Sequence, residues 1–101
     1  MIKIKISKTD TKFNSLEVKG HANSAEYGKD LVCAATSAVV IGGINNIENP
    51  KGFEIEVKSG YVKLEAIEEV SAHDAIVIET IICGLKTIQE ENNDFITIKA
   101  E

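Results

Sequence analysis

The chain has 101 residues, of which 44% are hydrophobic and 27% are charged. This composition is typical of one globular domain, 1–101, and excludes a disordered or fibrous protein. The net charge of −5 leaves no basic footprint for nucleic acid, so we expect no direct nucleic-acid partner. No apolar run reaches about 18 residues, and the first residues alternate Lys and Ile. We therefore expect no membrane span, no secretory leader and a cytoplasmic location.

Two cysteines and two histidines limit the kinds of site that the chain can build. Cys33 and Cys83 are too few for a secreted disulfide scaffold and form no CxxC pair. His21 and His73 do not combine with them at the spacing of zinc ligands. We therefore expect neither a metal nor a cofactor.

Two strands are predicted first in chain order. Residues 2–7 alternate Ile with polar residues, so the isoleucines share one face. Residues 13–19 form a second, less regular alternation, which is imperfect near Asn14. The polar residues 9–12 between them predict a turn, and the two runs are expected to form an antiparallel hairpin.

A first helix is predicted from Asp30 to Glu48. Its sequence is apolar on nearly every face, and a helix of this kind is buried either in the fold or in a partner. A chain of this length has little room to surround such a helix. Gly42 and Gly43 also allow another backbone to approach closely. We therefore expect a homodimer.

A second hairpin is predicted over 53–57 and 61–66, with Ser59-Gly60 as its turn. One face of this hairpin is wholly apolar, so its register is well specified. The predicted pairs are Phe53 with Ala66, Ile55 with Leu64, Val57 with Val62, Glu56 with Lys63, and Glu54 with Glu65.

Ser71 and Asp74 match a capping box and predict a second helix that runs to about Glu91. Cys83 is expected in the core on this helix, and residues 95–99 form the last strand. The order is ββαββαβ. This predicts a two-layer α+β fold, with two helices on a mainly antiparallel or mixed sheet. The apolar stripe of the second helix comprises Val77, Ile81, Leu85 and Ile88.

Cys33 is the candidate nucleophile. If Asp30 is the N-cap, Cys33 lies in the first helical turn, where unpaired N–H groups and the helix dipole favour a thiolate. The same N–H groups can receive an oxyanion. Ser37, four residues further on, shares the face of Cys33.

His21 is the candidate base, because a strand end and a helix start that pack side by side would bring it to Cys33. The stretch between them is small, polar and bracketed by glycines, and is predicted to be a mobile loop. Asp30 is the candidate orienting group for His21, and as N-cap it would also accept an N–H, such as that of Cys33.

Simpler interpretations stand beside this dyad. A cysteine in an Ala-rich helix is usually a small buried hydrophobe, and a helical serine such as Ser37 often bonds to the carbonyl four residues earlier. The rival functions are a non-catalytic peptide-binding dimer, a thiol redox protein that uses Cys33 and Cys83, and a purely structural dimer.

The segment Gly20-His21-Ala22, followed after a short loop by Gly28 to Ser37, resembles the ribosomal-processing cysteine protease family, Prp. The resemblance covers the whole chain, and the motif Gly-x-Asp-x-Val-Cys-Ala-Ala-x-Ser is specific. It implies a small cytoplasmic homodimer that removes an N-terminal extension from the precursor of large-subunit ribosomal protein number twenty-seven. Cleavage would follow a Phe-Phe pair in that N-terminal peptide.

The same resemblance implies the roles of individual residues. His21 and Cys33 correspond to the catalytic pair, and Asp30 and Ser37 to supporting motif positions. The loop is implied to gate the substrate, with Gly20, Ala22, Tyr27 and Gly28 among its residues. A ribosomal protein is basic and this chain is acidic, so electrostatic steering favours their encounter.

Overall fold

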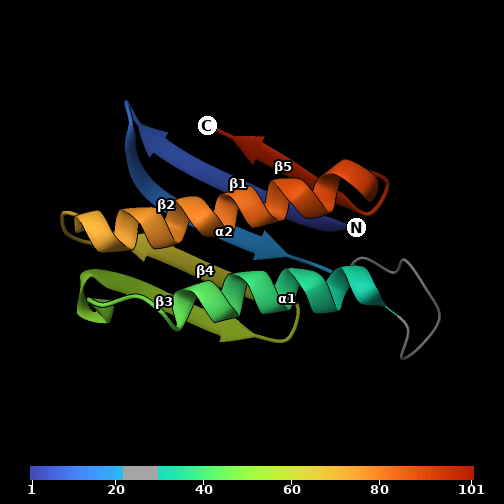
Figure 1. Ribbon diagram of the computed structural model, residues 1–101, viewed down its shortest axis with the longest axis horizontal. Helices are drawn as coiled ribbons and strands as arrows, with labels where there is room; N and C mark the ends of the chain where they lie inside the picture. The colour runs from blue at the N-terminus through green and yellow to red at the C-terminus, as the bar shows by residue number, and fades with distance from the viewer. Residues whose placement is uncertain (22–29) are drawn as a thin grey trace.

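The computed structural model describes residues 1–21 and 30–101. The strands and helices follow the predicted order ββαββαβ, with one short 3-10 turn, η1, before the second hairpin (Figure 1). Their bounds are β1 Ile2–Thr9, β2 Lys12–Lys19, α1 Leu31–Ile44, η1 Pro50–Gly52, β3 Phe53–Lys58, β4 Tyr61–Ala66, α2 Ala72–Glu91 and β5 Ile96–Ala100.

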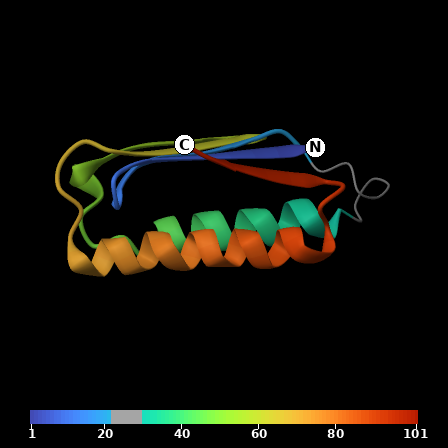
Figure 2. The same cartoon turned by 90° about the horizontal axis from the view of Figure 1, so that it is seen from above.

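The five strands form one mixed sheet in the order β3-β4-β2-β1-β5. Only the pairing of β1 with β5 is parallel; the other pairings are antiparallel. Both helices cover the same face of the sheet (Figure 2). The predicted two-layer α+β fold is therefore confirmed. In the described part of the chain, no helix has the length and apolar character needed to span a membrane.

The first hairpin turns at two residues, Asp10 and Thr11. Ser7 pairs with Ser15 but Lys8 pairs with Phe13, so Asn14 is an extra residue in β2. Such a bulge disrupts the alternation of side chains, which explains the irregular pattern seen in the sequence.

The second hairpin has the predicted register, from Phe53 opposite Ala66 to Lys58 opposite Tyr61. The opposed residues Glu56 and Lys63 pair with other groups. Glu56 lies 3.0 Å from the Lys58 ammonium and Lys63 lies 3.8 Å from Glu65. All these ion pairs are exposed and contribute little to stability.

The core lies between the sheet and the helices. Two glycines allow the helices to pack closely: a β-carbon at Gly84 would lie 2.7 Å from Val39, and one at Gly43 would collide with Ile81. Gly43 therefore serves the α1–α2 contact, whereas a β-carbon at Gly42 would meet nothing within 4 Å. The buried apolar residues include Ile2, Ile4, Ile6, Leu16, Val40, Leu64, Ile81, Leu85 and Ile96.

Helix α1 ends at Ile44, so the predicted extension to Glu48 is wrong. The backbone N–H groups of Glu48 and Asn49 donate to the carboxylate of Asp74, at 2.8 and 3.1 Å. An N–H group that is bound to a side chain of α2 cannot continue the hydrogen-bond ladder of α1. The N–H groups of Asn46 and Ile47 already bond three residues back, to the carbonyls of Gly43 and Ile44, so the α-helical ladder ends before Glu48 and the Asp74 contact holds the turn that follows.

Asp74 is fully buried, with 0% of its surface exposed. Its N–H donates to the Ser71 hydroxyl at 3.2 Å, which confirms Ser71 as the N-cap. Its carboxylate binds the Glu48–Asn49 turn, so this is not the reciprocal capping box that was predicted. Burial opposes ionisation, but the N–H of Glu48, the imidazole of His73 and the N–H of Asn49 together lower the pKa of Asp74.

We predict that Asp74→Asn destabilises the fold by about 1–3 kcal/mol at neutral pH, because an amide cannot accept both N–H bonds. The lowered pKa means that the ionised carboxylate stabilises the native state above the unfolded-state pKa. This stabilisation is lost as the pH falls through the native pKa. Urea unfolding between about pH 3 and 7 should therefore show a smaller pH dependence for the variant. The exposed Asp94→Asn is the control, and an unchanged pH dependence in Asp74→Asn would refute the assignment.

Candidate active site

Helix α1 begins at Leu31, and Asp30 is its N-cap. The Asp30 carboxylate accepts a hydrogen bond from the N–H of Cys33 at 3.1 Å, and its carbonyl accepts from Ala34 at 3.2 Å. The capping role of Asp30 is therefore confirmed. It has a chemical consequence, because an oxyanion that used the N–H of Cys33 would have to replace this carboxylate.

His21 lies two residues after the end of β2, and the backbone around it is held by two neighbouring segments. The N–H of Gly20 donates to the carbonyl of Gly60 at 2.8 Å, and the nitrogen of Met1 donates to the carbonyl of His21. Gly20 has a φ of +99°, and a β-carbon there would lie 2.5 Å from the Met1 carbonyl oxygen. Only glycine fits this position, which explains the residue before His21.

Gly60 belongs to the site as well as to its hairpin turn. Its φ is +70°, and a β-carbon on it would lie 2.7 Å from Nε2 of His21. Because Gly60 has no side chain, the imidazole of His21 has room to pack against the turn. Sequence reasoning missed this role, because it depends on the pairing of β2 with β4, which brings Lys19 opposite Tyr61.

His21 and Cys33 line one cavity of about 330 Å³, between the end of the sheet and the start of α1. Ser37 and Gly20 line it too, so the structure brings these four predicted residues together. Ala22, Tyr27 and Gly28 lie outside the described residues. The rest of the wall comprises Ile2, Val18, Thr36, Val40, Ile41, Lys58, Ser59, Gly60, Tyr61 and Val62.

The wall of this cavity is mixed, with apolar side chains such as those of Val18, Ile41 and Val62 beside the polar ones of Ser37 and Lys58. The Tyr61 hydroxyl donates to Glu17 at 2.9 Å, and this hydrogen bond raises the pKa of Tyr61, so the phenol stays neutral at physiological pH. The Lys58 ammonium lies 5.2 Å from the centre of the Tyr61 ring. A thiol and an imidazole beside one cavity are the parts that nucleophilic acyl transfer needs.

Cys83 is exposed, so the prediction that it lies in the core is wrong. It lines a different hollow from Cys33, together with Phe13 and Lys86. In the described part of the chain no disulfide joins the two cysteines. This separation gives no support to a redox pair.

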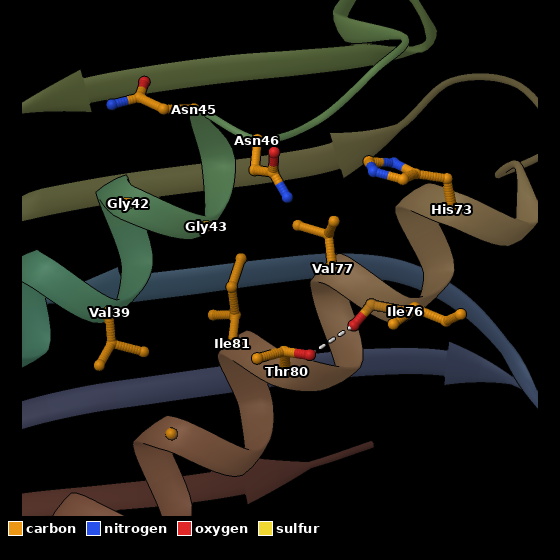
Figure 3. Close-up of a pocket in the computed structure, with 11 residues that line it drawn as sticks. Val39, Gly42, Gly43, Asn45, Asn46, His73, Ile76, Val77, Thr80 and Ile81 are labelled. Atoms are coloured by element: carbon orange, nitrogen blue, oxygen red, sulfur yellow. Dashed lines mark hydrogen bonds between the residues drawn. The ribbon is translucent and has the colours of Figure 1, made fainter.

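A larger hollow, of about 820 Å³, lies between α1 and α2 on the helix layer (Figure 3). It contains neither Cys33 nor His21. Its lining is largely apolar, with Ile76, Val77 and Ile81 on one side and His73 near one end (Figure 3).

Three potential metal ligands also gather in the described part of the chain, at the start of α2. One ligand atom each from Glu48, His73 and Asp74 lies within 4.8 Å of the others. Spacing along the sequence did not predict this group, because Glu48 comes from the turn after α1. Both carboxylate oxygens of Asp74 already accept backbone N–H bonds, and His73 lies 2.9 Å from one of them. The observed role of the group is to hold that turn.

Comparison with known proteins places this geometry in context. The sequence profile of the family "Cysteine protease Prp" matches residues 1–97. The ribosomal processing cysteine protease Prp of Bacillus subtilis is 40% identical over 88 residues, 79% of each chain. That of Mycoplasma genitalium is 37% identical over 102 residues, covering all of this chain and 97% of the relative.

Solved structures agree with the sequence relatives. The ribosomal processing protease Prp of Staphylococcus aureus, in complex with a covalently linked product peptide, superimposes with a TM-score of 0.88 at 28% identity over the whole of both chains. The same protease in complex with a substrate peptide gives a TM-score of 0.84 at 27% identity, again over both whole chains. This chain, with a cysteine and a histidine beside one cavity, therefore belongs to the Prp family of cysteine proteases.

Proposed function

We propose that this protease removes a short N-terminal extension from the precursor of bacterial large-subunit ribosomal protein number twenty-seven, cutting after a Phe-Phe pair. The observation that carries the proposal is the shared cavity of His21 and Cys33. The names of the relatives and the peptides bound to the Staphylococcus aureus protease support it. The reaction belongs in the cytoplasm, where ribosomal proteins are made, and requires no cofactor.

The proposed mechanism is acyl transfer through a Cys–His dyad. His21 removes the proton from Sγ of Cys33, and the thiolate attacks the carbonyl carbon of the scissile bond. The tetrahedral intermediate collapses to a thioester while His21 gives its proton to the leaving amine. Water, activated by His21, then hydrolyses the thioester and frees the thiol.

Backbone N–H groups at the start of α1 are the proposed oxyanion donors. The N–H of Cys33 is among them once the carboxylate of Asp30 moves away from it. Asp30 then stabilises the resting enzyme, and its charge opposes formation of the neighbouring thiolate.

The surroundings of the cavity suit an extended basic peptide with aromatic residues. The apolar side chains of its wall favour an aromatic side chain. β3 is an edge strand of the sheet, and its last residue, Lys58, lines the cavity, so a peptide strand added to this edge would lead to Cys33. The net charge of −5 attracts a basic partner.

A peptide-binding dimer without catalysis is the alternative, and the same cavity favours it. The two differ only in whether the peptide bond breaks, so one experiment separates them.

We predict that the protein cuts a synthetic peptide bearing the Phe-Phe extension once, after the second Phe, and that Cys33→Ala abolishes the cut. Loss of the nucleophile should lower kcat by at least about a thousandfold. Mass spectrometry of the products measures this. Cys83→Ala, which removes the exposed thiol, should retain full activity.

An intact peptide with wild type would contradict the proposed protease substrate. Binding of that peptide, measured by calorimetry, would then support the non-catalytic dimer.

The role of Asp30 can be tested by Asp30→Asn, because asparagine caps helices about as well as aspartate. We predict that the variant keeps its thermal stability and that kcat/KM rises at lower pH than in wild type, since a charge that opposes the thiolate is removed. The pH profile of kcat/KM measures this. If Asp30 instead orients His21, kcat would fall by orders of magnitude across the whole profile.

We further propose that the chain is a homodimer and that the outer face of α1 forms the interface. Helix α1 has no charged residue between Leu31 and Ile44. Leu31 is 78% exposed, and Ala34, Ala38 and Gly42 are exposed too. An uncharged helix face of this kind is typical of a protein contact. A second copy is the occupant that fits, because its own α1 offers the same small, uncharged side chains.

The predicted consequence is that Ala38→Glu converts a dimer into a monomer, because the substitution buries two like charges in the contact. Sedimentation velocity should give twice the chain mass for wild type and the chain mass for the variant. Thr97→Glu, at an exposed position of β5, is the control and should stay dimeric. A monomeric wild type at all concentrations up to about 100 times the assay concentration would exclude this interface.

A further inference from the structure

Thr36 carries a buried hydroxyl that has no hydrogen-bond partner. The residue is 4% exposed, and its Oγ1 is the side-chain atom in the described part of the chain that is buried without a partner. Buried hydroxyls are almost always bonded, because leaving one unpaired is costly. An exception of this kind calls for a physical reason.

The usual partner of a helical threonine is the carbonyl four residues earlier. Thr80 and Thr87 of α2 follow this rule, since their hydroxyls donate to Ile76 and Cys83 at 2.8 and 2.9 Å. Thr36 does not, although it also lies within a regular helix. The fold itself therefore does not use this hydroxyl.

The position of Thr36 indicates where its partner comes from. It follows Cys33 by three residues, so both lie on neighbouring parts of one helix face, and both line the cavity of the candidate active site. Hydroxyl and methyl groups of threonine are similar in size. A rotation about χ1 exchanges them at little steric cost, so a residue that lines the cavity can present its hydroxyl to a bound peptide.

We propose that Thr36 is a substrate-binding residue whose hydroxyl forms a hydrogen bond with the peptide that fills the cavity. This assignment rests on the proposed function of the same cavity. The bond has two possible sources in a peptide: a backbone amide or carbonyl beside the scissile bond, or the hydroxyl of a tyrosine in place of phenylalanine. The chemistry of the bond is the same for both.

The variant that tests the proposal is Thr36→Val, which keeps the shape and removes the hydroxyl. Two effects of opposite sign are expected. The free protein should unfold at a temperature about 4–8 °C higher, since an unpaired buried hydroxyl is removed. Peptide binding, measured by calorimetry in a Cys33→Ala background, should weaken by about three- to tenfold, as kcat/KM should in the active enzyme.

Two peptides distinguish a backbone partner from a side-chain partner. One has Phe and the other has Tyr immediately before the scissile bond. Weaker binding of both peptides by Thr36→Val identifies a backbone partner. Weaker binding of the Tyr peptide alone identifies the side-chain hydroxyl. Thr36→Ser should keep wild-type affinity, and Thr80→Val, which removes an exposed hydroxyl of α2, should change neither peptide's affinity.

Unchanged affinity for both peptides in Thr36→Val would overturn the proposal while leaving the protease intact. A lower unfolding temperature would overturn it as well, because the hydroxyl would then have a partner within the fold. If wild type neither cuts nor binds either peptide, the proposed function itself fails, and the assignment of Thr36 fails with it.

Discussion

The pairing of β2 with β4 determines where His21, the proposed catalytic base, lies in this fold. The ladder runs from Ser15 opposite Glu65 to Lys19 opposite Tyr61, and the bond between Gly20 and Gly60 extends it past the strand ends. His21 is thereby held against Gly60, the turn residue that lacks a side chain. Cys33 comes from the other layer, at the N-terminal end of α1. The sheet and the helix layer each supply one member of the proposed dyad, so packing of the two layers also sets the catalytic geometry (Figures 1 and 2).

Local patterns predicted the parts of the fold that depend on local physics. The β3–β4 register followed from the turn at Ser59-Gly60 and the alternation around it, and the caps at Asp30 and Ser71 followed from residue type. The end of α1 did not follow, since the turn after it is held by the carboxylate of Asp74, which accepts two N–H groups from residues more than 20 positions earlier. No window of sequence that includes only α1 contains that information.

The candidate site shows the same division. A motif around His21 and Cys33 predicted the pair, and the structure places both at one cavity. Gly60 and Thr36 were missed for different reasons. Gly60 has a sufficient local explanation as a turn residue, so its contact with His21 appears only when β2 and β4 pair. Thr36 is distinctive only by what its hydroxyl lacks, and that depends on the orientation of one side chain within a helix of ordinary composition.

Two polar groups near the thiol differ in their hydrogen bonding in the resting enzyme. The N–H of Cys33 has a charged partner in Asp30, which the proposed reaction must displace, whereas the hydroxyl of Thr36 has none. Displacement of Asp30 exchanges one anion for another at the same N–H, so the oxyanion gains only the difference between the two bonds. A new bond at Thr36 is a net gain on binding, because nothing in the fold is broken to form it. If the peptide bonds to Thr36 as proposed, its binding would supply free energy that helps to release the cap at Cys33, and substrate recognition would be linked to assembly of the proposed oxyanion site.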